Sequence, residues 1–168
     1  MAIFTVLKVG FLWTGKIGTG VVIGRRDDGS WSAPSAIRTG GCGFGAQIGG
    51  EVTDAIVIIN TTEALKAFSG LGQFCLGGEI AVAVGPVGRS AEGNIRAGDK
   101  GMCGCMSYSH SKGLFAGVSL EGSIVYQRKD VNKKFYGTDV QVEELIMGHR
   151  ERPHAAKPLY DALDGLIN

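Results

Sequence analysis

Two close pairs of acidic side chains are the first candidates for chemistry in this sequence. Asp27 and Asp28 are followed directly by Gly29, and an Asp-Gly step supplies the backbone freedom of a tight hairpin turn, which explains this pair most simply. Glu51 and Asp54 could instead act as a general acid and base, or supply oxygen ligands to half of a calcium site. Neither pair has the spacing of a calcium-binding loop, so structural acids are favoured, no cofactor is expected, and calcium stays the alternative.

Two cysteines have a spacing that could serve a metal. Cys103 and Cys105 place their thiols on one face of a strand, and His110 follows closely in the sequence. No second pair at ligand spacing follows, which favours small apolar strand residues. The N-terminal run lacks the basic residues of an export signal, so we expect all four cysteines, including Cys42 and Cys75, to be reduced and free of metal.

Catalytic and nucleotide-binding motifs are weak or missing. Residues 41–46 match GxGxxA, but a dinucleotide-binding loop needs a helix directly after it and an acidic residue about 20 positions later. Residues 47–50 (QIGG) make a poor helix. His110, His149 and His154 have no acid and nucleophile beside them in a catalytic motif. The sequence therefore predicts a protein that is not an enzyme.

Basic residues gather in three short clusters, namely Arg25-Arg26, Arg128-Lys129 and Lys133-Lys134. The first two clusters each end a predicted strand just before an acidic residue. If both strand ends lie at one edge of the sheet, the clusters form a cationic surface for an anionic lipid headgroup, worth ~1 kcal/mol for each cation near an anionic membrane. The alternative is a solvated strand end with Asp130 as its local partner, and charge spacing alone does not decide.

The composition excludes several classes of protein. The net charge is +1, so no field of one sign covers the molecule, and a general nucleic-acid binder is not expected. No uncharged apolar run is long enough for a membrane-spanning helix. Glycine contributes 28 of 168 residues, well above its usual ~7 %. Only 4 prolines accompany the glycines, which argues against a collagen or linker composition.

Hydrophobic patterning predicts mostly strands, with helices near the C-terminal end. The strands are expected at residues 3–13, 17–26, 55–60, 74–85, 102–109 and 114–127, and the helices at 61–68, 131–136, 140–147 and 155–166. Glycines recur inside these strands, where they permit close backbone approach, bulges and sharp coiling. We therefore expect an α+β fold with at least six strands, in a curved antiparallel sheet or small barrel.

Four longer strings resemble the signature of SYLF domains. They are residues 15–22 (GKIGTGVV), 28–37 (DGSWSAPSAI), 47–54 (QIGGEVTD) and 111–122 (SKGLFAGVSLEG). Tyr136-Gly137 also falls where that family has it, and the similarity runs from Ala2 to Leu163. The resemblance implies a single SYLF-like domain over residues 1–168, lacking the helical segment that usually precedes the first strand in this family.

The resemblance also implies a function. SYLF domains bind phosphoinositide-containing membranes, and those of yeast actin-patch proteins bind and bundle actin filaments. By similarity we expect a cytoplasmic module, peripheral at the endosomal or plasma membrane, with anionic phosphoinositide membranes and actin filaments or endocytic adaptor proteins as partners. The competing interpretation is a protein-binding scaffold without direct lipid contact.

Overall fold

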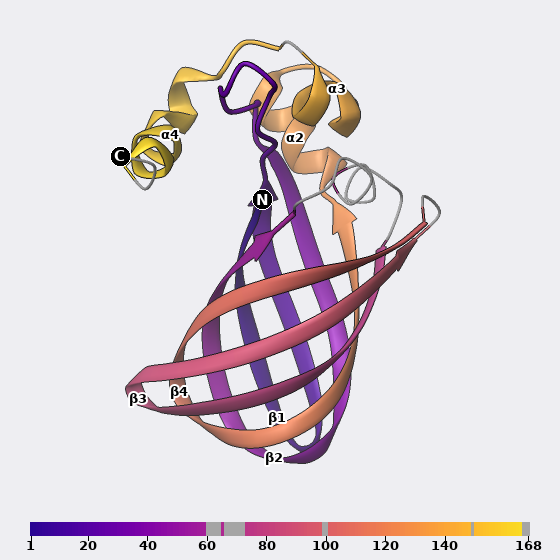
Figure 1. The fold of residues 1–168 in the computed structure, drawn as a ribbon, viewed down its shortest axis with the longest axis vertical. Coiled ribbons are helices and arrows are strands. Elements are labelled where there is room, and N and C mark those ends of the chain that lie inside the picture. Colours follow the sequence, from indigo (N-terminus) through magenta and orange to yellow (C-terminus); the bar gives the residue numbers. More distant parts are fainter. Residues whose placement is uncertain (60–64, 66–72, 99–100, 149, 166–168) are drawn as a thin grey trace.

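The computed structural model describes residues 1–59, 65, 73–98, 101–148 and 150–165. One antiparallel sheet contains four long strands, β1 (Ala2–Val22), β2 (Ser35–Ile58), β3 (Gln73–Gly98) and β4 (Gly101–Gln127), in the order β1-β2-β4-β3. The sheet is strongly curved but not closed, and the short helices gather at one end of it (Figure 1). They are α2 (Lys129–Tyr136), α3 (Val142–Met147), η1 (His154–Ala156) and α4 (Lys157–Asp164).

The α+β class, the curved antiparallel sheet and the C-terminal helices confirm the sequence predictions, but the strand count was wrong. Four strands, rather than six or more, account for the sheet in the described ranges. The predicted break at residues 14–15 lies inside β1, because the chain bends at Leu12 and residues 14–15 continue to pair with β2. The helix expected at residues 61–68 falls outside the described residues, apart from Leu65.

Strand β1 doubles back on itself around Leu12. This residue has a φ of 60°, the only positive φ of a non-glycine residue in the described chain, and the register with β2 shifts between Phe11 and Trp13. The two ends of β1 then meet, since the Met1 amino group donates to the Ile23 carbonyl at 2.8 Å and the Ile23 amide donates to the Met1 carbonyl at 2.9 Å. The inner surfaces of the two halves of β1 therefore face each other.

Glycine makes this doubling-back possible. A Cβ atom placed on Gly20 would lie 2.1 Å from the Ile3 carbonyl oxygen, and one on Gly18 would lie 2.8 Å from the Thr5 carbonyl oxygen. Neither distance is sterically possible for a real side chain. Much of the unusual glycine content of β1 thus serves close contact between backbones that face each other.

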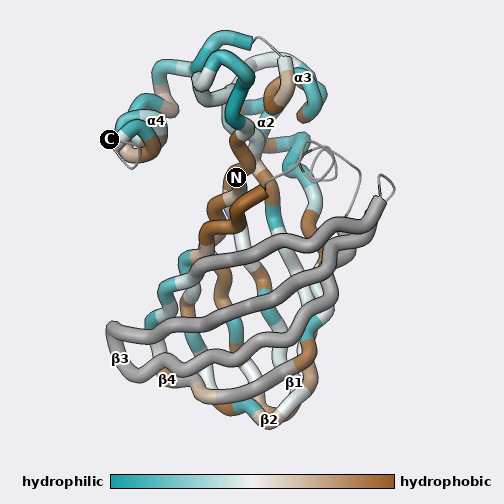
Figure 2. The backbone as a smooth tube through the Cα atoms, in the orientation of Figure 1, coloured by the Kyte–Doolittle hydropathy of each residue, from teal (hydrophilic) through white to brown (hydrophobic). Residues whose placement is uncertain are grey.

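The apolar core lies between the open end of the bent sheet and helix α3. Side chains from both ends of β1, from β2 and from β4 pack together with two residues of α3: Ala2, Phe4, Val22, Ile37, Val57, Val125, Val142 and Ile146. Figure 2 shows the hydrophobic stretches of chain around the N-terminus, beneath the helices. Burial of these side chains stabilises the junction between the sheet and its helical cap.

The string at residues 28–37 has a clear structural role. It begins with the predicted hairpin turn, in which Gly29 has a φ of 80°, and continues through the buried residues 31–35 to the start of β2. The Asn132 side chain accepts from the Ala36 amide and donates to Ser35, both within 2.9 Å. The Tyr136 hydroxyl donates to the Pro34 carbonyl, and the Tyr160 hydroxyl donates to the Ser32 carbonyl. This segment therefore holds α2 and α4 in place.

Replacing Gly20 with Ala tests the close approach within β1. We expect Gly20→Ala to lower the free energy of unfolding by about 1–3 kcal/mol, because the new methyl group must displace the Ile3 backbone. Gly15→Ala is the matched control, since nothing lies within 4 Å of a Cβ at that position of the same strand. Urea denaturation of both variants measures the difference, and equal stabilities would contradict the folded-over strand.

Candidate functional site

A buried charge cluster occupies the inside of the bend. The ammonium groups of Lys8 and Lys16 both contact the Glu121 carboxylate, Lys16 at 2.6 Å. In a straight strand Lys8 and Lys16 would lie roughly 26 Å apart. They reach one carboxylate because β1 folds over between them, so the cluster connects both halves of β1 to β4.

The two buried glutamates of this interior titrate in opposite directions. Burial alone would raise the pKa of Glu121, but the positive charges of Lys16 and Lys8 outweigh it and lower the pKa to about 2. Burial raises the pKa of Glu51, and the charge of Lys8 only partly opposes the rise. Glu121 is therefore a firmly ionised partner of two lysines, whereas the ionised form of Glu51 is disfavoured by its surroundings.

A calcium site would need the carboxylates of Glu51 and Asp54 close together, but the structure places them apart. Both belong to β2, but Glu51 points inward and is 2 % exposed, whereas Asp54 is exposed on the outer face and accepts a hydrogen bond from Thr5 at 2.7 Å. Side chains three positions apart in a strand lie on opposite faces, which is the physical reason. Among the described residues no group of three His, Cys, Asp or Glu side chains could hold a metal ion.

Other candidate motifs fall on plain strand. Residues 41–46 lie inside β2 and are followed by more strand, so the GxGxxA string forms no phosphate-binding loop. Cys42 on this strand is an exposed, free thiol. The other three cysteines have side chains outside the described set, and their reduced state stays a prediction.

The basic clusters lie at one end of the sheet, which is the condition on which a common cationic surface depends. Val22 at the end of β1 pairs with Ser35 of β2, and Gln127 at the end of β4 pairs with Ile37 of the same strand. Helix α2 follows β4 directly, so the lysines of α2 and the Arg25-Arg26 pair both belong to the helical end of the molecule.

Helix α2 presents an exposed cationic face. Its residue Asn132 is buried against β2, and Lys129, Lys133 and Lys134 are exposed on its other sides. None of these lysines has an ion-pair partner within the described chain. Arg128 differs, because its guanidinium pairs with Asp130 at 2.9 Å, the local partner expected from the sequence.

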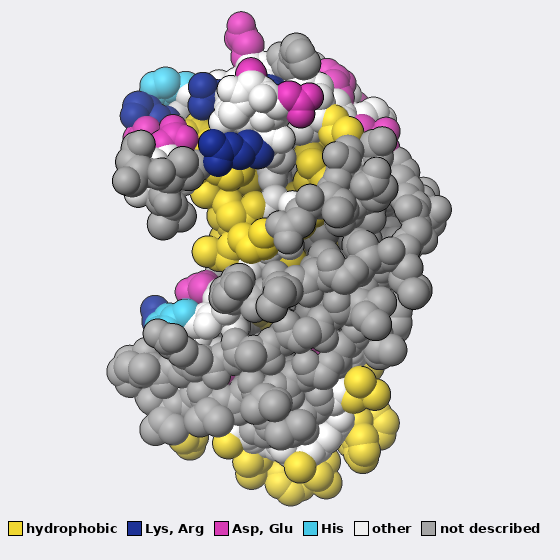
Figure 3. Space-filling view, in the orientation of Figure 1, with side chains coloured by type: hydrophobic (Ala, Val, Ile, Leu, Met, Phe, Trp, Pro, Cys, Tyr) yellow, Lys and Arg dark blue, Asp and Glu magenta, His cyan; other side chains and the backbone are white. Residues whose placement is uncertain are grey.

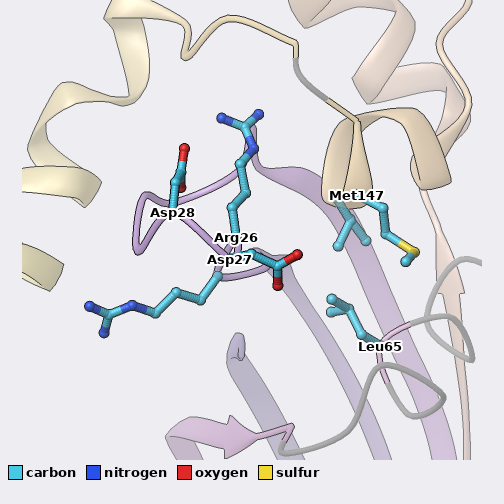
Figure 4. A pocket seen from close by; sticks show the side chains of 7 residues that line it. Arg26, Asp27, Asp28, Leu65 and Met147 are labelled. Carbon is cyan, nitrogen blue, oxygen red and sulfur yellow. The ribbon is translucent and has the colours of Figure 1, made fainter.

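Arg25 and Arg26 line a pocket of about 370 Å³ together with Asp27, Asp28, Leu65, Ile146 and Met147. The Arg26 guanidinium points toward the chain after α3, where it donates to the carbonyls of Gly148 and Arg150, both at 2.9 Å (Figure 4). Arg25 lies over the Trp31 ring at 5.3 Å. Two aspartates balance the two arginines, so this pocket is less suited to an anion than the exposed lysines of α2.

The outer face of the bend is apolar and exposed, which the sequence analysis did not anticipate. We define the apolar tip as the exposed side chains at the fold of β1 and β2: Phe11, Leu12, Trp13, Phe44 and Ile48. They are between 47 % and 69 % exposed, and the rings of Trp13 and Phe44 contact each other at 4.9 Å. Figure 3 shows hydrophobic side chains gathered at this end of the molecule, opposite the helices.

More apolar side chains continue from the tip along the outer face of β1, β2 and β4. They are Leu7, Val9, Ile17, Val52, Leu114, Leu120 and Ile124. Alternation along the strands was the available signal, but it separates two faces without saying which one points inward. Here the charged residues point inward at the bend and the apolar residues point outward.

Two exposed surfaces stand out in the described part of the chain: the cationic face of α2 at one end and the apolar tip at the other. A family model described as "Ysc84: Las17-binding protein actin regulator" matches residues 40–166. The chain belongs to this family, whose domain is the SYLF domain, and the resemblance found in the sequence is confirmed.

Relatives from fungi and animals match nearly the whole chain. It is 50 % identical over 167 residues to the SH3 domain-containing protein PJ696.02 of Schizosaccharomyces pombe, covering 99 % of this chain and 39 % of the relative. It is 46 % identical over 164 residues to LAS seventeen-binding protein 3 of Saccharomyces cerevisiae, covering 98 % and 36 %. The human SH3 domain-containing YSC84-like protein 1 is also 46 % identical, covering 98 % and 47 %.

The chain thus spans less than half the length of these relatives. No solved structure matches it. None of the helices in the described ranges is long and apolar enough to span a bilayer.

Removing the shared carboxylate should weaken the bend. We expect Glu121→Gln to lower the free energy of unfolding by roughly 3–5 kcal/mol at pH 7, because it leaves two buried ammonium groups without their anion. Since the folded pKa is about 2 and the ordinary value is 4.5, the stabilising effect of ionised Glu121 is present above pH 4.5 and is lost as the pH falls toward 2. Urea denaturation midpoints of the wild type and Glu121→Gln, measured across this pH range, test the prediction. Glu144→Gln, which removes an exposed ion pair with Arg150, is the control.

Glu51 should behave in the opposite way. Its folded pKa lies above the ordinary value of 4.5, so wild-type stability falls as the pH rises through the interval between the two values. Glu51→Gln removes the cost of the buried charge, and we expect its melting temperature to exceed that of the wild type at pH 7. The advantage should shrink toward zero below pH 4, and a variant that is less stable at pH 7 would show that ionised Glu51 is favourably bound.

Proposed function

We propose that this domain is a non-enzymatic module that binds phosphoinositide-containing membranes and links them to actin regulation in endocytic traffic. One observation carries the membrane part of the proposal: Lys129, Lys133 and Lys134 are exposed together on α2 with no ion-pair partner in the described chain. Multivalent phosphoinositide headgroups are small and highly anionic, so a cluster of flexible ammonium groups suits them well. The proposed location is peripheral, on the cytoplasmic side of endosomal or plasma membranes.

Because the total charge is close to neutral, attraction to an anionic membrane depends on this local cluster of lysines. With a net charge of +1, the whole molecule gains little from long-range attraction to an anionic surface. Lys129 and Lys133 are four positions apart and so lie on neighbouring turns of the helix, where one headgroup can meet both. Arg25 can add to the positive field nearby. Arg26 already donates to backbone carbonyls, and Arg128 is paired with Asp130.

The actin part of the proposal comes from the family. The matching family model is described as an actin regulator, and relatives at 46 % identity are named for binding LAS seventeen. We carry this over as a proposed partner class: actin filaments or the regulators of their assembly.

A protein-binding scaffold without lipid contact is the second candidate. LAS seventeen-binding protein 3, a relative, is named for a protein partner. Two of the six candidate headgroup residues, Arg26 and Arg128, make internal polar contacts. In this alternative the lysines of α2 meet an acidic protein surface instead of a headgroup.

Reversing the charge of α2 separates these two candidates. We expect the triple change Lys129→Glu, Lys133→Glu and Lys134→Glu to abolish co-sedimentation with phosphoinositide vesicles, since attraction becomes repulsion. The matched control changes the same three lysines to Arg and should retain binding. Binding of the wild type should also weaken as the Debye length shrinks from ~10 Å at 0.1 M salt to ~3 Å at 1 M.

Actin co-sedimentation completes the comparison. If the Glu variant binds vesicles as well as the wild type while remaining folded, the lysines are not a headgroup site. If the Glu variant also loses binding to actin filaments or to the actin-regulatory partner, the lysines of α2 form a protein-binding site, as the scaffold alternative proposes.

A further inference from the structure

The apolar tip has the wrong polarity for a surface that faces water. Its side chains are outside, while Lys8, Lys16 and Glu121 are buried directly behind them on the inner face of the same bend. Water-soluble sheets normally bury their apolar face, and outward apolar residues with inward polar ones are typical of strands that contact hydrocarbon. An exposed apolar surface of this kind marks a binding site.

Leu12 adds a second, independent observation. It occupies the apex of the bend in a left-handed conformation, with a φ of 60°, and its side chain is 47 % exposed. A leucine here is unfavourable for the backbone and for hydration, whereas glycine or asparagine would relieve both costs. Strain at an exposed apolar residue points to a use for that side chain outside the folded chain itself.

The charge pattern around the tip suits a lipid surface. Moving away from the tip along the outer face of β1 and β2, we call the first charged position in each direction a border of the apolar surface. One border is at Asp54, which pairs with Thr5 and His110, and the other is at Arg38, which pairs with Thr19. Thr5 and Thr19 are equally far in sequence from Leu12, so the two borders lie at matching distances from the apex. Between them, no described outward side chain of β1 or β2 is charged.

The cations at these borders complement anionic headgroups. Arg38 is exposed at one border, where it lies over the Tyr126 ring at 4.6 Å, and Lys112 is exposed beside the other. Both borders lie on the same side of the tip, so they face one layer of headgroups. The exposed Asp54 carboxylate shares a border with Lys112, so the uncompensated positive charge comes from Arg38.

The shape of the tip favours lipid over a second copy of the chain. The apolar side chains lie on the convex outer face of the bent sheet, at the end opposite the helices (Figures 1 and 3). Two convex faces touch over a small area, whereas a stable protein interface needs about 800 Å² on each partner. Fluid acyl chains adapt to a convex surface and can cover all of it.

We infer that the apolar tip is a membrane-insertion site, which enters the acyl-chain region of a lipid surface while Arg38 and Lys112 meet the headgroups. The inference rests on the proposed membrane function, but it assigns a separate site that binds hydrocarbon rather than phosphoinositide. Insertion places Trp13 among acyl chains. Trp31 is buried beneath the helices, so its surroundings do not change.

The two tryptophans of the chain provide the test. In Trp31→Phe the remaining Trp13 reports on the tip, and in Trp13→Phe the remaining Trp31 is the matched control. With phosphatidylcholine–phosphatidylserine vesicles we expect Trp13 fluorescence to shift to shorter wavelength and to be quenched by brominated acyl chains, with no change for Trp31. Unchanged Trp13 emission from vesicle-bound protein would overturn the inference.

Monolayers of uncharged phosphatidylcholine separate this site from the lysines of α2. The wild type and the α2 charge-reversal variant should both raise the surface pressure. The variant Phe11→Ser, Leu12→Gly, Phe44→Ser should insert far less, by roughly tenfold for each large apolar side chain removed. Phe135→Ser with Met147→Ser removes exposed apolar groups at the helical end and should insert normally.

The outcomes distinguish the two proposals. Monolayer insertion without phosphoinositide binding would sustain the tip and refute the headgroup site. Phosphoinositide binding without insertion or quenching would refute the tip and leave the headgroup site standing. A concentration-dependent shift of Trp13 fluorescence without lipid, together with dimers in analytical ultracentrifugation, would assign the tip to a second copy and overturn the inference.

Discussion

The contact of one carboxylate with two lysines of the same strand is the constraint on which this architecture depends. Glu121 holds Lys8 and Lys16 together, and that is possible only where β1 has doubled back. The two lysine ammonium groups and the carboxylate between them make the inner face of the bend polar. Because side chains alternate between the two faces of a strand, the apolar side chains then point outward. The interior ion cluster and the exposed apolar tip are thus two consequences of the same fold.

Local signals in the sequence were sufficient for much of this fold. The Asp-Gly step marked the hairpin turn, repeated glycines indicated a curved sheet, and helical spacing marked α3 and α4 to within a few residues. The strings that resemble SYLF domains identified the family correctly. The structure adds a reason for one of them, because residues 31–36 anchor the helices through Asn132, Tyr136 and Tyr160.

The remaining features depend on contacts that no short window contains. Gly10 lies against Thr14, Gly20 against Phe4 and Met1 against Ile23, so positions equally distant from Leu12 meet across the bend. A local pattern interprets Thr14-Gly15 as a break, whereas tertiary packing makes it a continuing strand. The same limit applies to Glu51 and Asp54, whose short spacing suggested a shared site until strand geometry put them on opposite faces.

The two candidate binding surfaces lie at opposite ends of the molecule, and this separation bears on how the domain works. The lysines belong to α2, which is fixed to residues 34–36 at the helical end, whereas the tip is formed by the fold of β1 and β2 (Figure 1). A flat membrane that holds the tip does not cover the helical end, so the cationic face of α2 remains accessible to an anionic partner. Under the proposed function this partner is a second, phosphoinositide-containing membrane, and under the scaffold alternative it is an acidic protein surface. In both cases the tip and α2 can be occupied at the same time, because they lie at opposite ends of the molecule.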